Sequence, residues 1–449
     1  FKQKTAYEIM PSLVGSEMCI RDRRIYGLAT DEKGRLYVAT GGIYLTPLFW
    51  IKVFDRNGKY LKTIMPFPPD LPEEALCGFG ARKVNGRCVP GNFHPLVPRL
   101  YDAGLVTFTS NFVRDNCLGI LVTDGRVCRI DTDGGCIDWE NAPKTPIKPE
   151  GGPLCLAEDR ERGVLYVSGI WTPKKRRRKR NWTDGTLYKF DFSSGTVSPF
   201  FKLNVPEESF WLVEKNGWYN FTNWGRENGC AAFHGLWLGP SGEIYLCDRV
   251  NQRIAVISPH GKLTESIPVK WPDHVAVGKD PSVIYVVTQK VVDGYKAINE
   301  VEVLKIRRIP AFSVVSRIKF EGKNAPSFAL DLSSDPPVLW LSNVKGGVVR
   351  IEDRCDKFAY TGFISMREEN GPGVVKVWAD PPSETIFVNN GWNLLCKYNG
   401  ASGRGGPIPL TGIDLAVGPD QFGSGRGCRG LSAPGSDGRP RLRLQRSTF

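Results

Sequence analysis

The sequence lacks the motifs by which many enzymes are recognised. It has no nucleophile elbow and no P-loop, and the Gly-x-Gly run of its C-terminal tail has no strand–helix setting. None of the 12 cysteines forms a CxxC pair, which argues against a zinc ribbon or a thioredoxin-like site. No stretch of about 18 apolar residues occurs, so we expect no membrane span. No amphipathic helical pattern separates the short apolar runs, which disfavours a parallel βαβ fold.

Both ends of the chain differ in character from its middle. Residues 1–23, FKQKTAYEIMPSLVGSEMCIRDR, resemble the translation of a sequencing-library adapter, with a genuine polar N-terminus as the alternative. Residues 421–449 are dominated by Gly, Ser, Pro and Arg without periodicity, which indicates a disordered or frameshifted tail. We therefore expect residues 1–23 to be non-native and residues 24–420 to form the folded domain.

The net charge of +13 comes from a few segments. The N-terminal segment contributes +1, the basic run at 174–180 contributes +7 and the C-terminal tail contributes +5, so the rest of the chain is formally neutral. A fold that binds nucleic acid would carry basic residues over one face. Because the folded body is formally neutral, we do not expect it to bind nucleic acid. The run at 174–180 is interpreted as a solvated loop, with a nuclear address or a polyanion contact as the alternative.

The cysteine distribution leaves the cellular compartment open. Cys77 and Cys88 bracket a Pro-rich excursion and could form a disulfide in an oxidising compartment, although free, partly buried thiols fit the scattered pattern better. The sequence favours an extracytoplasmic or periplasmic location, but the expected loss of the true N-terminus removes any evidence of a signal peptide. We expect a monomer.

The chain contains an internal repeat, which is clearest at residues 233–269. Here four short apolar runs, GLWLG, EIYLCD, RIAVIS and KLTESI, are separated by turn residues. Runs of this length that are rich in Ile, Val, Leu and Tyr predict strands, and four of them at this spacing match one propeller blade. Related copies occur at residues 25–64, 154–203, 272–320, 326–364 and 372–410, with a weaker copy at 104–140.

The second strand is the most constant part of the repeat. Its copies read LYVAT, VTFTS, LYVSG, IYLCD, IYVVT, LWLSN and IFVNN. Such continuous hydrophobicity is expected of a strand that is covered on both faces. We therefore predict an all-β fold, a β-propeller of four-stranded blades. Seven blades are favoured, and six or eight are the alternatives because both ends of the repeat array are damaged.

The unit at 233–269 resembles an NHL repeat. The residues that carry the resemblance include the D-x-x-N-x-R run and are Gly235, Leu236, Gly242, Tyr245, Asp248, Asn251 and Arg253. The resemblance implies a toroid of four-stranded blades around a central channel, but it is specific to a repeat class and not to one activity. We expect Asp248, Asn251 and Arg253 to be structural repeat residues, since charge pairs near turns are usually satisfied locally. Ligand binding by Asp248 and Arg253 is the alternative.

Histidine is scarce, and two of the four histidines occupy equivalent positions. His234 and His274 stand at the first-strand entries of consecutive blades, which is similar to NHL-type propeller lyases that hold a metal with histidines from several blades. A catalytic zinc site needs about three protein ligands and an open position, and Asp273 or a cysteine could complete the set. A divalent metal ion is therefore a cofactor that this pair could help to hold, and hydrogen-bonded or solvated histidines are the alternative.

Two further groups of residues could contact a ligand. Asparagines that follow second strands could face the channel, as in gluconolactonase-like propellers that hold a divalent cation, although asparagine is also common in turns. They are Asn111, Asn343, Asn389 and Asn390. The insertion at 205–232 lacks strand periodicity, and its aromatic side chains could anchor a partner or pack on the propeller wall. Its ligand-binding candidates are Trp211, Trp218 and Trp224.

These residues favour a binding propeller without an identifiable catalytic apparatus. Its channel-face loops would recognise a protein, a peptide or a glycan. The alternative is a metal-dependent propeller enzyme, a lyase or a lactone hydrolase, with its site at the central channel. A fold alone does not decide between the two, so the sequence leaves enzymatic activity open and favours its absence.

Overall fold

The computed structural model describes most of the repeat array and short parts of the remaining chain. The described residues are 24–41, 49–65, 67–68, 71–76, 81–84, 87–90, 107–122, 125–137, 139–147, 154–169, 185–204, 212–215, 218–221, 232–293, 298–309, 312–322, 326–344, 347–365, 376–380, 385–389, 395–399, 405–407, 431–432 and 441–442. The chain forms two compact units, one of Arg23–Met366 and one of Phe1–Asp22 with Arg367–Phe449. No helix in the described part is long and apolar enough to cross a bilayer.

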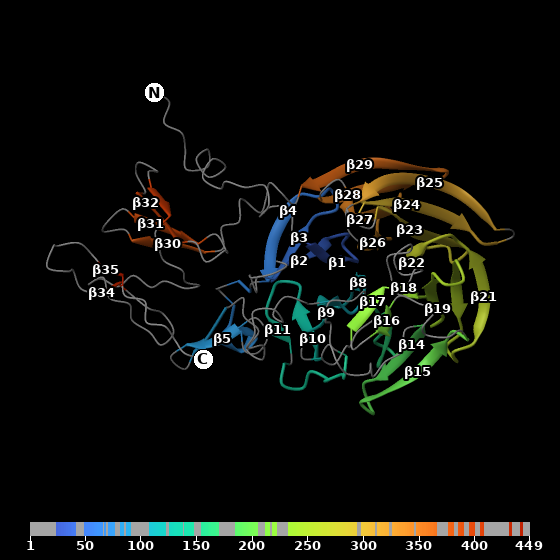
Figure 1. Ribbon diagram of the computed structural model, residues 1–449, viewed down its shortest axis with the longest axis horizontal. Helices are drawn as coiled ribbons and strands as arrows, with labels where there is room; N and C mark the ends of the chain where they lie inside the picture. The colour runs from blue at the N-terminus through green and yellow to red at the C-terminus, as the bar shows by residue number, and fades with distance from the viewer. Residues whose placement is uncertain are drawn as a thin grey trace, which may run out of the picture. The chain divides into compact units, whose positions relative to one another are not determined.

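The described strands of the larger unit form six successive four-stranded blades around a common centre (Figure 1), and a single pair, Gly322 with Val344, joins the last two blades into one eight-stranded sheet. Blade 1 consists of β1 (Arg24–Asp31), β2 (Leu36–Gly41), β3 (Phe49–Phe54) and β4 (Tyr60–Met65). Blade 2 consists of β7 (Thr107–Phe108), β9 (Cys117–Leu121), β10 (Val127–Asp131) and β11 (Cys136–Ile137). Blade 3 consists of β12 (Leu154–Asp159), β13 (Val164–Gly169), β14 (Thr186–Asp191) and β15 (Thr196–Lys202).

The other three blades follow the same order along the chain. Blade 4 consists of β18 (Phe233–Leu238), β19 (Ile244–Asp248), β20 (Arg253–Ile257) and β21 (Leu263–Pro268). Blade 5 consists of β22 (Pro272–Val277), β23 (Val283–Asp293), β24 (Ile298–Arg307) and β25 (Ser313–Gly322). Blade 6 consists of β26 (Phe328–Asp331), β27 (Val338–Val344), β28 (Gly347–Arg354) and β29 (Lys357–Ser365). Paired strands within each blade are antiparallel.

Blades 1 and 6 contact each other and thereby close the ring. The hydroxyl of Thr30 in β1 donates to the carbonyl of Leu330 in β26 at 2.8 Å, and Arg56 forms an ion pair with the buried Asp331 at 2.8 Å. Buried apolar side chains of the two blades form one cluster of Ile25, Leu28, Leu36, Val38, Phe54, Ala329, Val338, Trp340, Val348 and Ile364. The predicted all-β propeller class is confirmed, and the described residues of this unit form six groups of strands with the order expected of a blade.

The copy that the sequence places at 372–410 lies in the other unit. Its four strands form one antiparallel sheet of β30 (Lys376–Asp380), β31 (Thr385–Asn389), β32 (Leu395–Asn399) and β33 (Gly405–Pro407). Two short strands farther along, β34 (Leu431–Ser432) and β35 (Arg441–Leu442), pair with each other. The predicted seven blades included this copy. Its strands form a sheet in the unit that does not contain the six blades described above.

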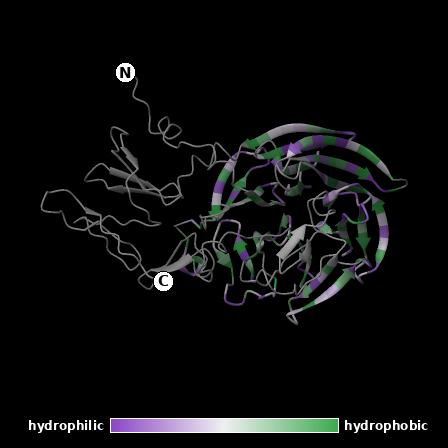
Figure 2. Cartoon of the chain, viewed as in Figure 1, coloured by the Kyte–Doolittle hydropathy of each residue, from purple (hydrophilic) through white to green (hydrophobic). Residues whose placement is uncertain are grey.

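The position of a strand in its blade accounts for its hydrophobic pattern. All residues of the second strand β19 are buried, as expected of a strand with a neighbouring blade on each face. The rim strand β25 alternates exposed and buried residues along most of its length, whereas β21 is mostly exposed with Ile267 buried, and both show mixed colours in Figure 2. A rim strand has one face toward its neighbours and one toward solvent, which produces this alternation.

Glycines at tight turns connect the first and second strands. Gly34 has φ +74° and its N–H donates to the carbonyl of Asp31 at 2.9 Å. Gly242 has φ +84° and its N–H donates to the carbonyl of Gly239 at 3.0 Å. A side chain strains the backbone at such φ values, so the repeated glycine of the sequence has a conformational reason at these two turns.

Several short elements interrupt the regular blades. A 3-10 helix, η1 (Glu73–Leu76), places Leu76 in the apolar core of blades 1 and 2. A hairpin of β5 (Ala81–Val84) and β6 (Arg87–Pro90) follows, and β8 (Phe112–Val113) pairs in parallel with β1. The insertion at 205–232, for which we expected no strand, contains the hairpin β16 (Leu212–Lys215) and β17 (Trp218–Phe221). Cys77 and the basic run 174–180 lie outside the described residues.

Candidate functional site

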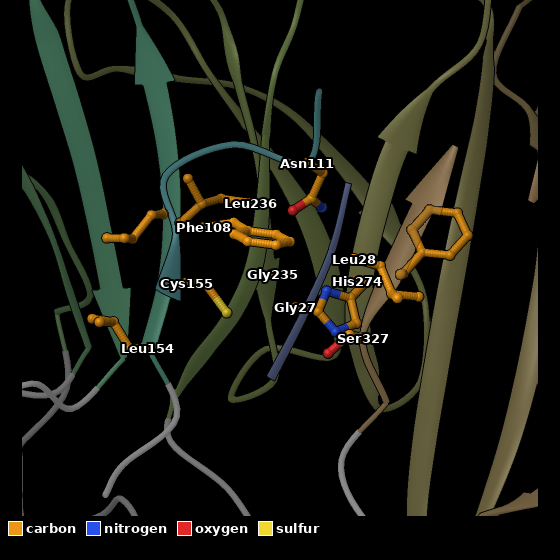
Figure 3. Close-up of a pocket in the computed structure, with 12 residues that line it drawn as sticks. Gly27, Leu28, Phe108, Asn111, Leu154, Cys155, Gly235, Leu236, His274 and Ser327 are labelled. Carbon is orange, nitrogen blue, oxygen red and sulfur yellow. The ribbon is translucent and has the colours of Figure 1, made fainter. Parts of the chain in front are cut away.

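A pocket lies at the centre of the ring, where the inner strands of all six blades converge (Figure 3). Its cavity volume is about 60 Å³, and it opens to solvent on one side. Its lining residues are Gly27, Leu28, Phe108, Asn111, Leu154, Cys155, Leu156, Gly235, Leu236, His274, Ser327 and Phe328. None of them is Asp, Glu, Lys or Arg. The pocket therefore combines apolar walls with a few polar groups that carry no fixed charge.

Phe108 ends β7, the first strand of blade 2, and Asn111 lies in the segment that follows this strand. The backbone carbonyl of Asn111 accepts a hydrogen bond from the N–H of Thr30 at 3.0 Å, which fixes this segment against β1. Figure 3 shows the Asn111 carboxamide and the Phe108 ring directed into the pocket. The Phe108 ring packs so closely on Gly27 that a Cβ there would lie 3.0 Å from a ring carbon. Gly27 thus lets the aromatic ring reach the pocket wall.

His274 extends into the pocket from β22 on the opposite side (Figure 3). Its Nε2 lies 2.8 Å from the carbonyl oxygen of Pro326, which can only accept a hydrogen bond, so Nε2 carries the proton. Asp273 Oδ2 lies 3.4 Å from the same nitrogen. A neutral imidazole held in this way has Nδ1 as an acceptor.

Behind this wall, blades 4 and 5 meet at a buried cluster of charged and titratable groups. His234 Nδ1 lies 2.5 Å from Asp273 Oδ1, and Arg249 Nη1 lies 3.5 Å from the same oxygen. Arg249 also donates to the carbonyl of Gln289 at 2.6 Å, and its side chain is 0 % exposed. Asp273 therefore links His234, His274 and Arg249 at one point of the blade interface.

Burial sets the protonation of this cluster. It lowers the pKa of His234 more than the nearby Asp273 carboxylate raises it. Burial alone would raise the pKa of Asp273, but His234, His274 and Arg249 together bring it down to about 2. The carboxylate is thus ionised and compensated by the permanent charge of Arg249, while the neutral His234 ring donates its Nδ1–H to it. His234 Nε2 is buried and has no hydrogen-bond partner among the described residues.

The protein should lose stability on mild acidification because of His234. Below pH 6.5, the ordinary pKa of histidine, His234 becomes protonated in the unfolded chain but stays neutral in the folded protein. The free energy of unfolding therefore falls as the pH falls. One such proton contributes at most about 1.4 kcal/mol per pH unit. Asp273 contributes to the pH dependence only below its ordinary pKa of 3.8. Urea unfolding at several pH values between 6.5 and about 4.5 should show a shallower slope for His234→Gln, and an unchanged slope would contradict this assignment.

The predicted repeat residues lie together at the turn after β19. The side chain of Asp248 is 0 % exposed and accepts hydrogen bonds from Asn251 Nδ2 and Arg253 Nε, each at 2.8 Å. The backbone N–H of Asn251 donates to the same carboxylate at 3.1 Å. None of the three residues lines the central pocket.

The other residues predicted to bind a ligand either do not line the pocket or have side chains outside the described part of the chain. Asn343 is the penultimate residue of β27, where its Nδ2 lies 3.4 Å from the carbonyl oxygen of Ile25 in blade 1, and it does not line the pocket. Asn389 ends β31 in the other unit, and Trp218 begins β17, but the side chains of both lie outside the described residues. Trp211, Trp224 and Asn390 lie outside them as well.

Of the predicted metal candidates, only His274 lines the pocket, and His234 lies behind it. Within the described part of the chain, no group of three or more His, Cys, Asp and Glu side chains could hold a metal ion. Arg249, Phe108 and Cys155 were not predicted from the sequence. Their common signal is a position in, or directly after, the first two strands of a blade, which the repeat alignment contains but does not single out.

The fold and the pocket define a β-propeller with an uncharged pocket at its centre. No family model matches the chain, and no curated protein matches it.

Among solved structures, the chain is similar to a streptogramin B lyase at 13% identity, covering 82% of this chain and 91% of that chain, with a TM-score of 0.39. It is similar to a virginiamycin B lyase from Staphylococcus aureus at 13% identity, covering 89% and 98%, with a TM-score of 0.39. The hydrazine synthase of Kuenenia stuttgartiensis aligns at 12% identity, covering 92% and 100%, with a TM-score of 0.38. Similarity at this level carries no inference about activity.

Proposed function

We propose that this protein is a binding propeller that holds its ligand, or one end of it, in the central pocket. The observation that carries the proposal is the lining itself, to which all six blades contribute and which contains polar groups but no fixed charge. Binding sites for small groups are typically concave and mostly apolar, with a few polar groups that orient the ligand. The pocket has this composition, and its walls are strands of a closed ring and therefore preformed.

The remaining sequence predictions belong to this proposal. The propeller is of the NHL type, acts as a monomer, and recognises a protein, a peptide or a glycan with the loops around the pocket. Residues 1–23 and 421–449 lie outside its native fold. The apolar walls and the neutral polar groups support recognition of an uncharged part of such a ligand, since a buried charge without a partner is costly.

Filling the pocket should abolish binding without unfolding the protein. Asn111 is half-buried and directed into the pocket, so a tryptophan at this position would occupy the ligand volume. Wild type, Asn111→Trp and the rim variant Leu263→Trp would be tested on a glycan array and on a phage-displayed peptide library. We expect ligands of the wild type to bind Asn111→Trp at least about tenfold more weakly and Leu263→Trp equally well.

Three results would count against the proposal. The first is equal binding by wild type and Asn111→Trp, and the second is wild-type binding to neither library at a Kd below about 1 mM. The third is a stoichiometric divalent ion that disappears in His234→Ala or His274→Ala, which would favour the metal-dependent lyase or lactone hydrolase instead. Metal analysis of the purified protein measures it directly.

A further inference from the structure

The connection between β24 and β25, the two outer strands of blade 5, exposes apolar side chains to solvent (Figure 1). Ile309 is 62% exposed, Phe312 is 46% exposed and Val314 is 37% exposed. They are three of the nine large apolar side chains that are exposed among the described residues, and Ile309 is the most exposed of the nine. Single exposed apolar residues are ordinary on a protein surface, but these three lie close together in the chain. We call them the β24–β25 tip.

Contacts of Arg308 anchor this tip on the rest of the propeller. The backbone N–H of Arg308 donates to the carbonyl of Ser282 at 2.7 Å, and its Nη1 donates to the hydroxyl of Tyr245 at 2.6 Å. Its Nη2 forms an ion pair with Glu265 of β21 in blade 4. The apolar side chains on either side of Arg308 are therefore presented to solvent from a base that is held by blade 4 and by the turn after β22.

The charged groups around the tip favour an anionic partner. Arg307, Lys279 in the turn after β22 and Lys262 in the turn before β21 are exposed, and none of them forms an ion pair among the described residues. Of the nearby carboxylates, Glu265 is already paired, and Asp280 accepts two hydrogen bonds from a serine at 2.8 and 2.7 Å. Three cations without an ion pair thus surround the tip together with one exposed carboxylate, which leaves this surface positive.

An exposed apolar tip among cations has the composition of a site that contacts an anionic lipid surface. Apolar side chains of such a site enter the boundary between headgroups and acyl chains. Nearby Lys and Arg side chains are attracted by the negative charge of lipids such as phosphatidylserine. A folded protein partner would need a concave apolar surface with carboxylates around it, whereas a fluid lipid surface adapts to a strand connection that carries its apolar groups outward.

We propose that the β24–β25 tip docks this protein on an anionic membrane surface, with Ile309 and Phe312 at the acyl boundary and the three cations at the level of the headgroups. This inference does not depend on the central pocket. His274 lies near the start of β22, and the turn that contacts Arg308 follows the end of the same strand. The tip and the pocket therefore lie at opposite ends of blade 5, so a docked protein would keep its pocket turned away from the membrane.

The test measures binding of the full chain to sedimented vesicles of phosphatidylcholine, with and without about 30 mol% phosphatidylserine. We expect wild type to bind the anionic vesicles at least about tenfold more tightly than the neutral ones. The double variant Ile309→Ser with Phe312→Ser removes apolar surface without changing the charge, and it should bind the anionic vesicles at least about tenfold more weakly than wild type.

The matched control for the tip variant is Tyr60→Ser with Leu61→Ser. These two side chains lie on β4 of blade 1 and are 44% and 46% exposed, so this variant removes a similar apolar surface at another place on the rim. We expect it to bind anionic vesicles within about twofold of wild type. Thermal unfolding of both double variants confirms that they are folded.

A second measurement separates insertion of the tip from attraction by other basic segments, such as the run at 174–180. Phe312→Trp and Leu61→Trp are compared on anionic vesicles with brominated acyl chains, which quench tryptophan emission on contact. After subtraction of the wild-type emission on the same vesicles, the tryptophan at position 312 should be quenched and the tryptophan at position 61 should not. Association through charge alone would quench neither of them.

Several outcomes would overturn the inference. Wild type that binds neither kind of vesicle does so, and so does a β4 variant that loses as much binding as the tip variant. Binding that survives the tip substitutions, without quenching of Phe312→Trp, would assign vesicle binding to the other basic segments. A dimer of wild type in solution that the tip variant converts to a monomer, without a change in vesicle binding, would make the tip a contact between two copies of the chain.

Discussion

Replacing Trp340 by alanine is expected to lower the free energy of unfolding by about 3–5 kcal/mol. Trp340 lies in β27 with 0 % of its side chain exposed, and it is the largest fully buried side chain among the described residues. It belongs to the apolar cluster that joins blade 6 to blade 1, together with Leu28, Phe54 and Ile364. Its removal would leave a cavity at the contact that closes the ring, where two ends of a long chain segment meet.

Conservative and exposed substitutions serve as controls for Trp340→Ala. The Nε1–H of Trp340 is buried without a hydrogen-bond partner among the described residues, so Trp340→Phe removes an unsatisfied donor and should cost less than about 1.5 kcal/mol. Phe363 lies on the rim strand β29 and is 41% exposed, so Phe363→Ala should change stability by less than about 0.5 kcal/mol. Urea unfolding followed by circular dichroism gives all three values. A loss below about 1 kcal/mol for Trp340→Ala would show that this cluster does not hold the ring closed.

The repeat made the architecture predictable, because each blade repeats the same local requirements. A turn glycine such as Gly242 and a fully buried second strand such as β19 follow from backbone geometry and from coverage on two faces. The number of blades in the ring does not follow from them. The copy at 372–410 has the same local pattern and forms its own sheet in the other unit, since the pattern specifies a sheet and not the neighbour on which it packs.

The site was predictable only where position in the repeat decides it. The equivalent first-strand entries singled out His234 and His274, and the structure brings both to Asp273. The repeat did not predict Arg249 as the third partner of Asp273, because this contact joins residues of two blades and depends on how the inner ends of those blades pack. A bulge in β18, where the register shifts between Phe233 and Leu236, also turns this part of the strand. Such irregularities are invisible in a repeat consensus.

Replacing Arg249 by methionine is expected to cost about 3–5 kcal/mol, because it leaves the Asp273 carboxylate buried without a permanent positive charge. Both side chains are almost completely buried, at 0 % and 2 % exposure. The guanidinium also holds the carbonyl of Gln289 in blade 5. Methionine preserves most of the side-chain volume, so the loss measures the missing charge and hydrogen bonds more than a cavity.

A second substitution distinguishes the unpaired charge from a general loss of packing. Adding Asp273→Asn to Arg249→Met removes the carboxylate that the first substitution leaves without a positive partner. It should restore at least about 1 kcal/mol of the free energy of unfolding, even though it also removes a polar contact. The matched control is Arg162→Met, since Arg162 pairs with Asp159 at 2.9 Å but is 50% exposed, and an exposed pair contributes about 0–1 kcal/mol. If urea unfolding at neutral pH gives the same loss for both arginines, the buried cluster does not depend on Arg249 for charge compensation. A larger loss for Arg249 that is partly restored by Asp273→Asn would establish that charge compensation of Asp273 stabilises the interface of blades 4 and 5, in addition to the apolar side chains that pack there.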